Sequence, residues 1–343
     1  MIMSRTQSAA VTDIADTTPA PYEVPHNPWR QALTGSVASI LFTVLAVVAV
    51  GWFWVGPKFL SFGNISIMGS FMIVPLIVGA CAGFALLAGV VDLSIGSMVG
   101  FSSACFALLL TLGWDPVSAG AVTLLFCLVF GGINAIAIVG FGAEPIAATL
   151  GMLVALRGIA WVLVGPSGSI FAFHPELFGI INQTLFGLPL FFLLALMLTA
   201  IAAIVVAKTK LGRHVQAVGG DDKAAARAGI SVTRVRVAAL LLSAFGAGVG
   251  GIVYAGQLGS AARATGFGLE FQVYAALMIG GYSILRGGVG NPIGGALGLL
   301  AVAGVSNILD LKAISPYYVN IIVGLLLLAA VLLDRFRGGD AYE

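Results

Sequence analysis

The chain has 343 residues, of which 59% are hydrophobic and 9% are charged, and its formal net charge is +2 at pH 7. Soluble domains carry about 25% charged residues, so this composition, with a mean hydropathy of +1.08, excludes a water-soluble protein and predicts a polytopic membrane protein. The three cysteines, Cys81, Cys105 and Cys127, lie apart in apolar runs, which excludes a disulfide framework and a Cys-x-x-Cys metal site.

Residues 1–34 are polar and rich in Ser, Thr and Pro. They lack the basic start of a signal peptide, and the apolar run that follows is too long for one. We therefore expect a disordered cytoplasmic tail over 1–34, a transmembrane domain over 35–334 and a second cytoplasmic tail over 335–343.

A helix needs about 20 apolar residues to cross a membrane core of about 30 Å. Ten segments qualify or nearly do, which predicts an all-α polytopic membrane protein with about ten transmembrane helices. Gly and polar residues interrupt the eighth and the ninth. The ten segments are 36–55, 67–88, 95–112, 117–139, 145–164, 188–207, 237–254, 267–284, 292–309 and 317–333.

The basic residues predict the orientation of these helices. With the N-terminus inside, twelve of the sixteen Lys and Arg residues fall on the inner side, and Arg157 lies within the fifth segment. Three fall outside: Lys58, Arg263 and Lys312. Because Lys and Arg concentrate in cytoplasmic loops, both termini are expected in the cytoplasm.

The joint between the second and third segments, LLAGVVDLSIGS, places Asp92, Ser94 and Ser97 at the inner boundary of the membrane. An unpaired carboxylate in lipid is costly, so Asp92 should face protein or water. Because it directly precedes an apolar run, its simplest role is to cap the third segment. A role in a gate would be additional.

The fifth segment begins at Glu144-Pro145, and Arg157 follows about 18 Å along the helix at 1.5 Å per residue. An intramembrane arginine needs a partner or an aqueous path. Two roles stay open: contact with such a path, or snorkelling and bonding to backbone carbonyls in helix packing.

The interval 208–236, KTKLGRHVQAVGGDDKAAARAGISVTRVR, is the one long polar stretch between apolar segments, and it holds seven of the sixteen basic residues. Asp221 or Asp222 can cap a short helix of good helix formers, Lys223 to Ala228. Gly229 can end that helix with a positive φ. This basic loop should face the cytoplasm, either as a contact surface or as a solvated loop that holds topology.

Two glycine-rich stretches predict close helix packing. Gly290, Gly294 and Gly298 recur every four residues, with Asn291-Pro292 starting the ninth segment. The G-x-G-x-x-G pattern that begins at Gly246 lies inside an apolar segment with no strand before it, so it indicates packing and not a dinucleotide site.

Several function classes are excluded by missing motifs. No Gly-Lys-Ser/Thr, His-Glu-x-x-His or Gly-x-Ser-x-Gly occurs in the sequence. The chain therefore cannot be its own P-loop ATPase, and a membrane metalloprotease or serine hydrolase is unsupported.

Four of these stretches, in order, resemble one family. Lys223-Ala224-Ala225 followed by Gly229 resembles the EAA…G coupling loop of ABC-transporter permeases, with Lys in place of Glu. The wider string GRHVQAVGGDDKAAARAGI is similar to the loop of the ribose/xylose/arabinose/galactose permease family. The stretches VVDLSIGS, EPIAATLGMLVALRG and IGGYSILRGGVGNPIGGALG resemble three further family segments, with Val90-Val91, Glu144 and Ala147 as departures.

The resemblance implies a permease of a monosaccharide importer in the bacterial inner membrane, and not an enzyme. The implied partners are a separate ABC ATPase that holds ATP and Mg, a periplasmic substrate-binding protein, a second copy of the chain in a homodimer, and membrane lipid. No nucleic acid is implied, nor any cofactor or metal bound by this chain. The periplasmic protein could meet the outer loops 166–187 and 256–268.

The resemblance also assigns residues. The loop that would receive the ATPase contains Gly212, Arg213, Gly219, Gly220, Asp221, Asp222, Lys223, Ala224, Ala225 and Gly229. The candidates along a translocation path or gate are Asp92, Ser94, Ser97, Arg157 and Asn291.

Alternatives remain at this point. Related permeases carry branched-chain amino acids or nucleosides. An ion-coupled secondary transporter would accumulate its solute without an ATPase. A membrane enzyme or a structural subunit would transport nothing.

Overall fold

The computed structural model describes residues 36–315, 318, 321–322, 324–329 and 331–332. Both predicted tails, 1–34 and 335–343, lie outside the described residues. The described residues of the tenth predicted segment, 317–333, are all helical.

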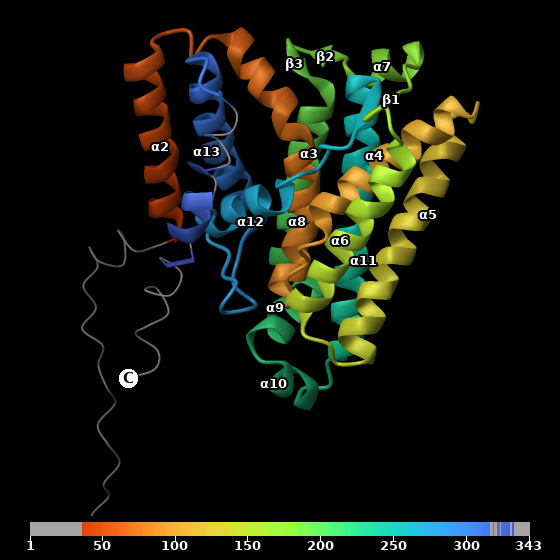
Figure 1. The fold of residues 1–343 in the computed structure, drawn as a ribbon. Coiled ribbons are helices and arrows are strands. Elements are labelled where there is room, and N and C mark those ends of the chain that lie inside the picture. Colours follow the sequence, from red (N-terminus) through yellow and green to blue (C-terminus); the bar gives the residue numbers. More distant parts are fainter. Residues whose placement is uncertain (1–35, 316–317, 319–320, 323, 330, 333–343) are drawn as a thin grey trace, which may run out of the picture. The chain divides into compact units, whose positions relative to one another are not determined.

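Among the described residues, eight long helices follow the predicted segments closely (Figure 1). Six of them are long and apolar enough to cross a membrane in the part of the chain that is described: α3, α5 with the π-helix that continues it, α6, α8, α11 and α13. The eight helices are α2 (Ser36–Val55), α3 (Phe62–Leu87), α4 (Ile95–Thr111), α5 (Pro116–Ala135) with η1 (Ile136–Gly140), α6 (Pro145–Val164), α8 (Leu190–Lys208), α11 (Val232–Leu258) and α13 (Pro292–Leu311).

The remaining elements are short. The helices are α7 (Pro175–Ile181), α9 (Lys210–Gly220), α10 (Asp222–Arg227) and α12 (Leu269–Ile279). Strand β1 (Ser169–Phe171) pairs antiparallel with β4 (Ser260–Ala262), with Ser169 opposite Ala262. Strand β2 (Thr184–Leu185) pairs with β3 (Leu188–Pro189).

The eighth predicted segment, 267–284, needs correction. Its helix, α12, has 11 residues, or about 16 Å at 1.5 Å per residue, which is too short for a core of about 30 Å. The helix ends before Gly280 and Gly281, and Gly281 has a φ of +91°. These glycines stop the helix where apolar composition alone suggested that it continues.

Local chemistry explains where the helices begin. The Asp115 carboxylate accepts from the backbone N–H groups of Val117 and Ser118 and so caps α5. Hydrogen bonds from Ser118 hold the pKa of Asp115 below its usual range. Glu144 caps α6 in the same way, accepting from Ala147 N–H, and Pro145 takes the first helical position, where its missing N–H costs nothing.

Helix α11 packs against α3, α4 and α5 along its glycines, as predicted. A Cβ on Gly246 would collide with Cys81 of α3. One on Gly248 would press on Cys127 of α5, and one on Gly251 would collide with a backbone carbonyl of α4. The dinucleotide-like pattern is therefore a packing face.

The predicted glycine face of α13 is confirmed for Gly294 and Gly298, whereas Gly290 precedes the helix and is not part of that face. Added Cβ atoms on Gly294 and Gly298 would collide with the backbone carbonyls of Gly280 and Ala276. The two helices α12 and α13 thus approach backbone to backbone, which only small residues permit.

Large apolar side chains stay exposed on the outer helices, for example Phe53 at 86% and Val162 at 80%. Such a surface would be unfavourable in water, whereas lipid tails are as apolar as the side chains themselves. Together with the long apolar helices, this surface identifies a multi-pass, all-α membrane protein.

Candidate functional site

The polar interval 208–236 folds into two helices, α9 and α10, at the end of the helices opposite α7 and strands β1, β2 and β3 (Figure 1). Thr209 caps α9 by accepting from Gly212 N–H. The predicted short helix is confirmed as α10, with Asp221 as its cap accepting from Ala224 N–H at 2.9 Å. The preceding helix α9 was not predicted, because its charges obscured the apolar positions Val215 and Val218, which are buried.

The end of α10 has the geometry expected of Gly229. Gly229 has a φ of +81°, and the N–H groups of Gly229 and Ile230 donate to the carbonyls of Ala226 and Ala225. This pair of hydrogen bonds is a Schellman motif, which favours glycine at its left-handed position. Helix α10 therefore has both ends fixed by its own sequence.

Helix α10 presents most of its surface to solvent. Lys223, Ala224, Ala226 and Arg227 are exposed, whereas Ala225 is 4% exposed. Asp222 pairs with Arg236 of α11 at 3.1 Å. A short helix of small side chains, held at one face and open at the other, can enter a groove on a partner.

The C-terminal end of α9 touches two other segments through backbone. A Cβ on Gly219 would collide with the carbonyl of Leu87 at the end of α3 and with the N–H of Gly288. That N–H in turn donates to the Leu87 carbonyl at 2.9 Å. We call Leu87, Gly219, Gly287 and Gly288 the glycine junction. It joins α9 to α3 and to the segment that precedes α13.

Asp92 lies between α3 and α4 and is 1% exposed. Its Oδ1 accepts from the backbone N–H of Ser94 at 3.1 Å and from the Ser94 hydroxyl. Its Oδ2 accepts from the Ser243 hydroxyl of α11 at 2.7 Å. The carboxylate therefore faces protein, as expected.

The structure differs from the expected cap, because Ser94 is the N-cap residue of α4 and makes no side-chain cap bond. Asp92 instead joins α4 to α11. The backbone of Asp92 also bonds the Tyr274 hydroxyl of α12, and Asn134 of α5 donates to Ser94. Four helices thus meet at one buried aspartate.

Two of the other three predicted path residues, Ser97 and Asn291, make no hydrogen bond to this cluster. Ser97 is 2% exposed, and its hydroxyl has no hydrogen-bond partner among the described residues. Asn291 is exposed and accepts from Ile293 N–H at the start of α13. Asparagine is a favoured N-cap residue, so capping of α13 is a sufficient reason for Asn291 at this position, without a role in a path.

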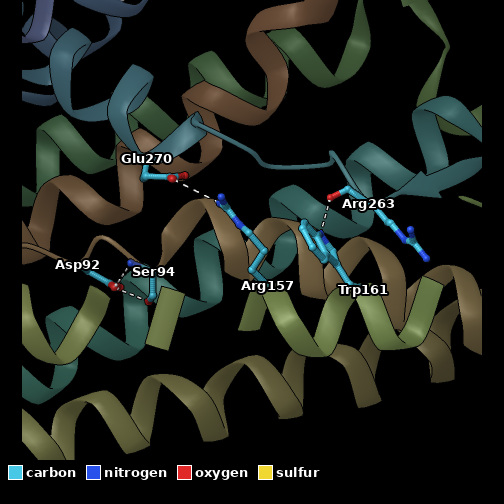
Figure 2. Close-up of polar contacts among 6 residues, drawn as sticks. All are labelled: Asp92, Ser94, Arg157, Trp161, Arg263 and Glu270. Carbon is cyan, nitrogen blue, oxygen red and sulfur yellow. Dashed lines mark hydrogen bonds and ion pairs between the residues drawn. The ribbon is translucent and has the colours of Figure 1, made fainter. Parts of the chain in front are cut away.

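Arg157 of α6 reaches Glu270 in the first turn of α12, with 3.4 Å between Nη2 and Oε1 (Figure 2). The side chains are 21% and 2% exposed. The guanidinium also lies 4.6 Å from the centre of the Phe267 ring, a favourable cation–π distance. Arg157 therefore has a protein partner, and it does not snorkel to the surface.

The Glu270 carboxylate lies against α4. Its Oε2 has no partner among the described residues, and a Cβ on Gly96 would collide with it. Gly96 is thus the residue that lets a carboxylate approach this helix.

Further contacts tie α6 to the segment before α12 (Figure 2). Trp161 Nε1 donates to the Arg263 carbonyl at 3.1 Å, and the Arg263 guanidinium donates to the Gly165 carbonyl at 2.6 Å. The β1–β4 ladder joins the two predicted outer loops. The segment 260–270 is therefore held to β1 at its start, and to α6 at Arg263 and at Glu270.

Sequence reasoning missed Glu270, Ser243, Asn134 and Tyr274. Glu270 carried a usable signal, since a single acid in one apolar segment and a single Arg in another predict an ion pair. The other three are isolated polar residues in apolar helices, and nothing in their spacing links them to Asp92. Among the described residues, no group of three or more His, Cys, Asp or Glu is placed to hold a metal.

Comparison with known proteins matches residues 64–331 to the family described as branched-chain amino acid transport system / permease component. The chain belongs to this permease family. It is therefore a transport component and not an enzyme, and it is a multi-pass protein of the bacterial inner membrane. The family works with an ATPase and a substrate-binding protein.

Several curated relatives are permease proteins of transport systems. The ribose import permease protein RbsC of Haemophilus influenzae is 29% identical over 301 residues, covering 87% of this chain and 92% of the relative. The D-allose transport system permease protein AlsC of Escherichia coli K12 is 29% identical, covering 86% and 90%. The autoinducer 2 import system permease protein LsrC of Escherichia coli O9:H4 is 31% identical, covering 87% and 86%. No solved structure matches the chain.

Proposed function

We propose that this chain is the permease subunit of an ATP-driven importer of a monosaccharide, which a periplasmic binding protein delivers. The relatives named for ribose and D-allose support this substrate class, and the similarity covers most of each chain. The family description itself mentions branched-chain amino acids, so a branched-chain amino acid is the main competing solute.

The observation that carries the coupling mechanism is the placement of α9 and α10. Helix α10 is exposed and offers a small-residue surface, while α9 anchors it to the membrane helices. The ATPase would bind at this surface. The loop that forms it contains Gly212, Arg213, Gly219, Gly220, Asp221, Asp222, Lys223, Ala224, Ala225 and Gly229, of which Gly212 and Ala225 are buried and would support the exposed residues. ATP and Mg would be held by the ATPase and not by this chain.

Movement of α9 would pass directly into the membrane helices through the glycine junction. Leu87 lies five residues before Asp92, and the Asp92 cluster joins α4, α5, α11 and α12. A shift of α9 would therefore displace the Asp92 cluster, where four helices meet. Asp92, Ser94, Ser97 and Arg157 would act in this rearrangement through the helices they join, and Asn291 would act at the start of α13.

The same contacts support ten membrane crossings with both termini in the cytoplasm. Segment 260–262 pairs with β1 at one end of the helices, and Gly288 bonds Leu87 near α9 at the other. Residues 263–287 would thus cross the membrane as α12 plus a non-helical stretch. Such a stretch is tolerated at membrane depth when protein surrounds it.

The assembled importer would contain a second copy of this chain, and the exposed apolar side chains would face lipid and that copy. No nucleic acid would take part. The outer loops 166–187 and 256–268 would meet the binding protein.

Reconstitution tests the proposed function. The chain would be co-purified from its native host with its ATPase and binding protein, and placed in proteoliposomes. Accumulation of labelled D-ribose or D-allose should require all three proteins and ATP, and labelled L-leucine should not accumulate. Accumulation by the chain alone would establish an ion-coupled transporter instead.

A further inference from the structure

A cavity of about 380 Å³ lies between α3, α11, the segment before and within α12, and α13. This volume is within the range of about 300–1,000 Å³ that small-molecule sites occupy. None of the five predicted path residues is among its lining residues. The cavity-lining residues of α11 come just before β4 in the chain. The cavity therefore lies toward the end of the helices that is opposite α9 and α10 (Figure 1).

The cavity has an apolar floor and an aromatic opening. Val74, Pro75 and Leu299 are buried in the floor. Phe71 and Phe267 are 72% and 66% exposed, so the cavity opens to the surface beside them. Flat aromatic surfaces beside polar groups suit a small ligand that has both apolar and polar faces.

The walls carry uncharged polar side chains from three helices. Tyr254 and Gln257 come from α11, Gln272 from α12 and Ser306 from α13. The Gln257 amide donates to the Ser70 carbonyl at 3.3 Å, which fixes its orientation. The side chains of Tyr254, Gln272 and Ser306 make no hydrogen bond with any other described residue, so their donors and acceptors remain available for a ligand.

The charges of the lining select the class of ligand. Asp310 is its one charged residue, it is exposed, and no Lys, Arg or His lines the cavity. The Arg157 guanidinium lies 4.6 Å from the ring of Phe267, but it is already paired with Glu270. A free amino acid would therefore bring a carboxylate without an unpaired cation to meet it. The start of α12 could attract an anion, but Glu270 in its first turn already offsets the positive end of the helix dipole.

The geometry points to this cavity as the solute site of the permease, built for a neutral, hydroxyl-rich molecule of monosaccharide size. The hydroxyls bond to Gln257, Gln272, Tyr254 and Ser306, and the C–H face of the ring lies on the aromatic opening. The inference rests on the proposed function and adds the site and its selectivity to it.

The test uses Ser306→Cys in the complete importer in nanodiscs, together with a membrane-impermeant maleimide. The native cysteines, Cys81, Cys105 and Cys127, are buried, so the introduced thiol is the reactive one. D-ribose or D-allose should slow labelling of the introduced thiol several-fold, and L-leucine should not. Thr111→Cys, exposed at the end of α4 and outside both outer loops, is the control whose labelling neither sugar should change.

A second variant separates the site from the rest of the mechanism. Gln272→Leu should raise the sugar concentration needed for protection by about tenfold, because one hydrogen-bonding group is lost. Stimulation of the ATPase by the loaded binding protein should persist. Thr111→Val, exposed at the end of α4 and outside both outer loops, should leave both readouts unchanged.

The outcomes are distinguishable. The wild-type importer could import sugar while the sugar gives the thiol no protection, or while the thiol is inaccessible to the reagent. Either result would refute the cavity as the solute site and leave the proposed function intact. Protection by L-leucine and not by sugar would overturn the ligand class. Failure of the wild-type importer to accumulate any sugar would overturn the proposed function, and this inference with it.

Discussion

The guanidinium of Arg157 lies 3.4 Å from the carboxylate of Glu270, and the two side chains are 21% and 2% exposed. The pair joins α6 to α12. It also fixes the segment that forms one wall of the cavity.

Removing the charge of one partner should therefore lower the free energy of unfolding more than removing both charges. Arg157→Met leaves an uncompensated buried carboxylate and should destabilise the protein by on the order of 3 kcal/mol. The double variant Arg157→Met/Glu270→Gln removes both charges and should recover much of that loss. Thermal unfolding in detergent measures the difference. A double variant no more stable than Arg157→Met would contradict the role of the pair.

Asp92 provides a second test, because its carboxylate accepts three hydrogen bonds from two helices. Asp92→Asn keeps one acceptor oxygen and gains a donor that the Ser243 hydroxyl can accept, so uptake should largely persist. Asp92→Ala loses all three bonds, each worth about 1.5–3 kcal/mol to a charged group, and should fail to fold. Ser243→Ala loses one hydrogen bond, so its stability should lie between those of Asp92→Asn and Asp92→Ala.

An ion-coupled transporter would behave differently at this position. There Asp92→Asn would abolish uptake while the melting temperature of the protein stayed near that of wild type. Loss of uptake with an unchanged melting temperature would contradict the structural role assigned to Asp92.

Two glycines test the glycine junction as a matched pair, Gly219 within it and Gly63 of α3 outside it. Gly219→Ala places a methyl group against the Leu87 carbonyl and the Gly288 N–H, so either α9 or α3 must shift. Gly63→Ala, exposed in α3, meets nothing within 4 Å. We expect Gly219→Ala to reduce ATP-driven uptake strongly while ATP hydrolysis continues, and Gly63→Ala to leave both rates unchanged. Equal effects of the two substitutions would show that the junction transmits nothing.

Much of this architecture was predictable from the sequence. The helix starts at Pro116, Pro145 and Pro292 follow from proline at the first helical position, and long apolar runs locate most spans. The α10 helix was predictable in full, since Asp221 and Gly229 mark its ends. Periodic glycines predicted the α11 and α13 packing faces.

What the sequence could not supply is the partners of isolated polar residues. Asp92 was expected to act locally on α4, and its bond to Ser243 spans 151 positions. The shortness of α12 depends on turns at Gly280 and Gly281, and apolar composition does not reveal them. The cavity is lined from five separate segments, and its polar residues have no common spacing.

The central claim is that an ATPase drives this chain through α10, and single-cysteine crosslinking tests it most directly. Ala224 is exposed on α10, and Thr184 is exposed in β2. With the co-purified ATPase and a short thiol–amine crosslinker, Ala224→Cys should form a covalent permease–ATPase product, and Thr184→Cys should form none. Absence of the product at Ala224, in an assembled complex that still imports its solute, would contradict the account.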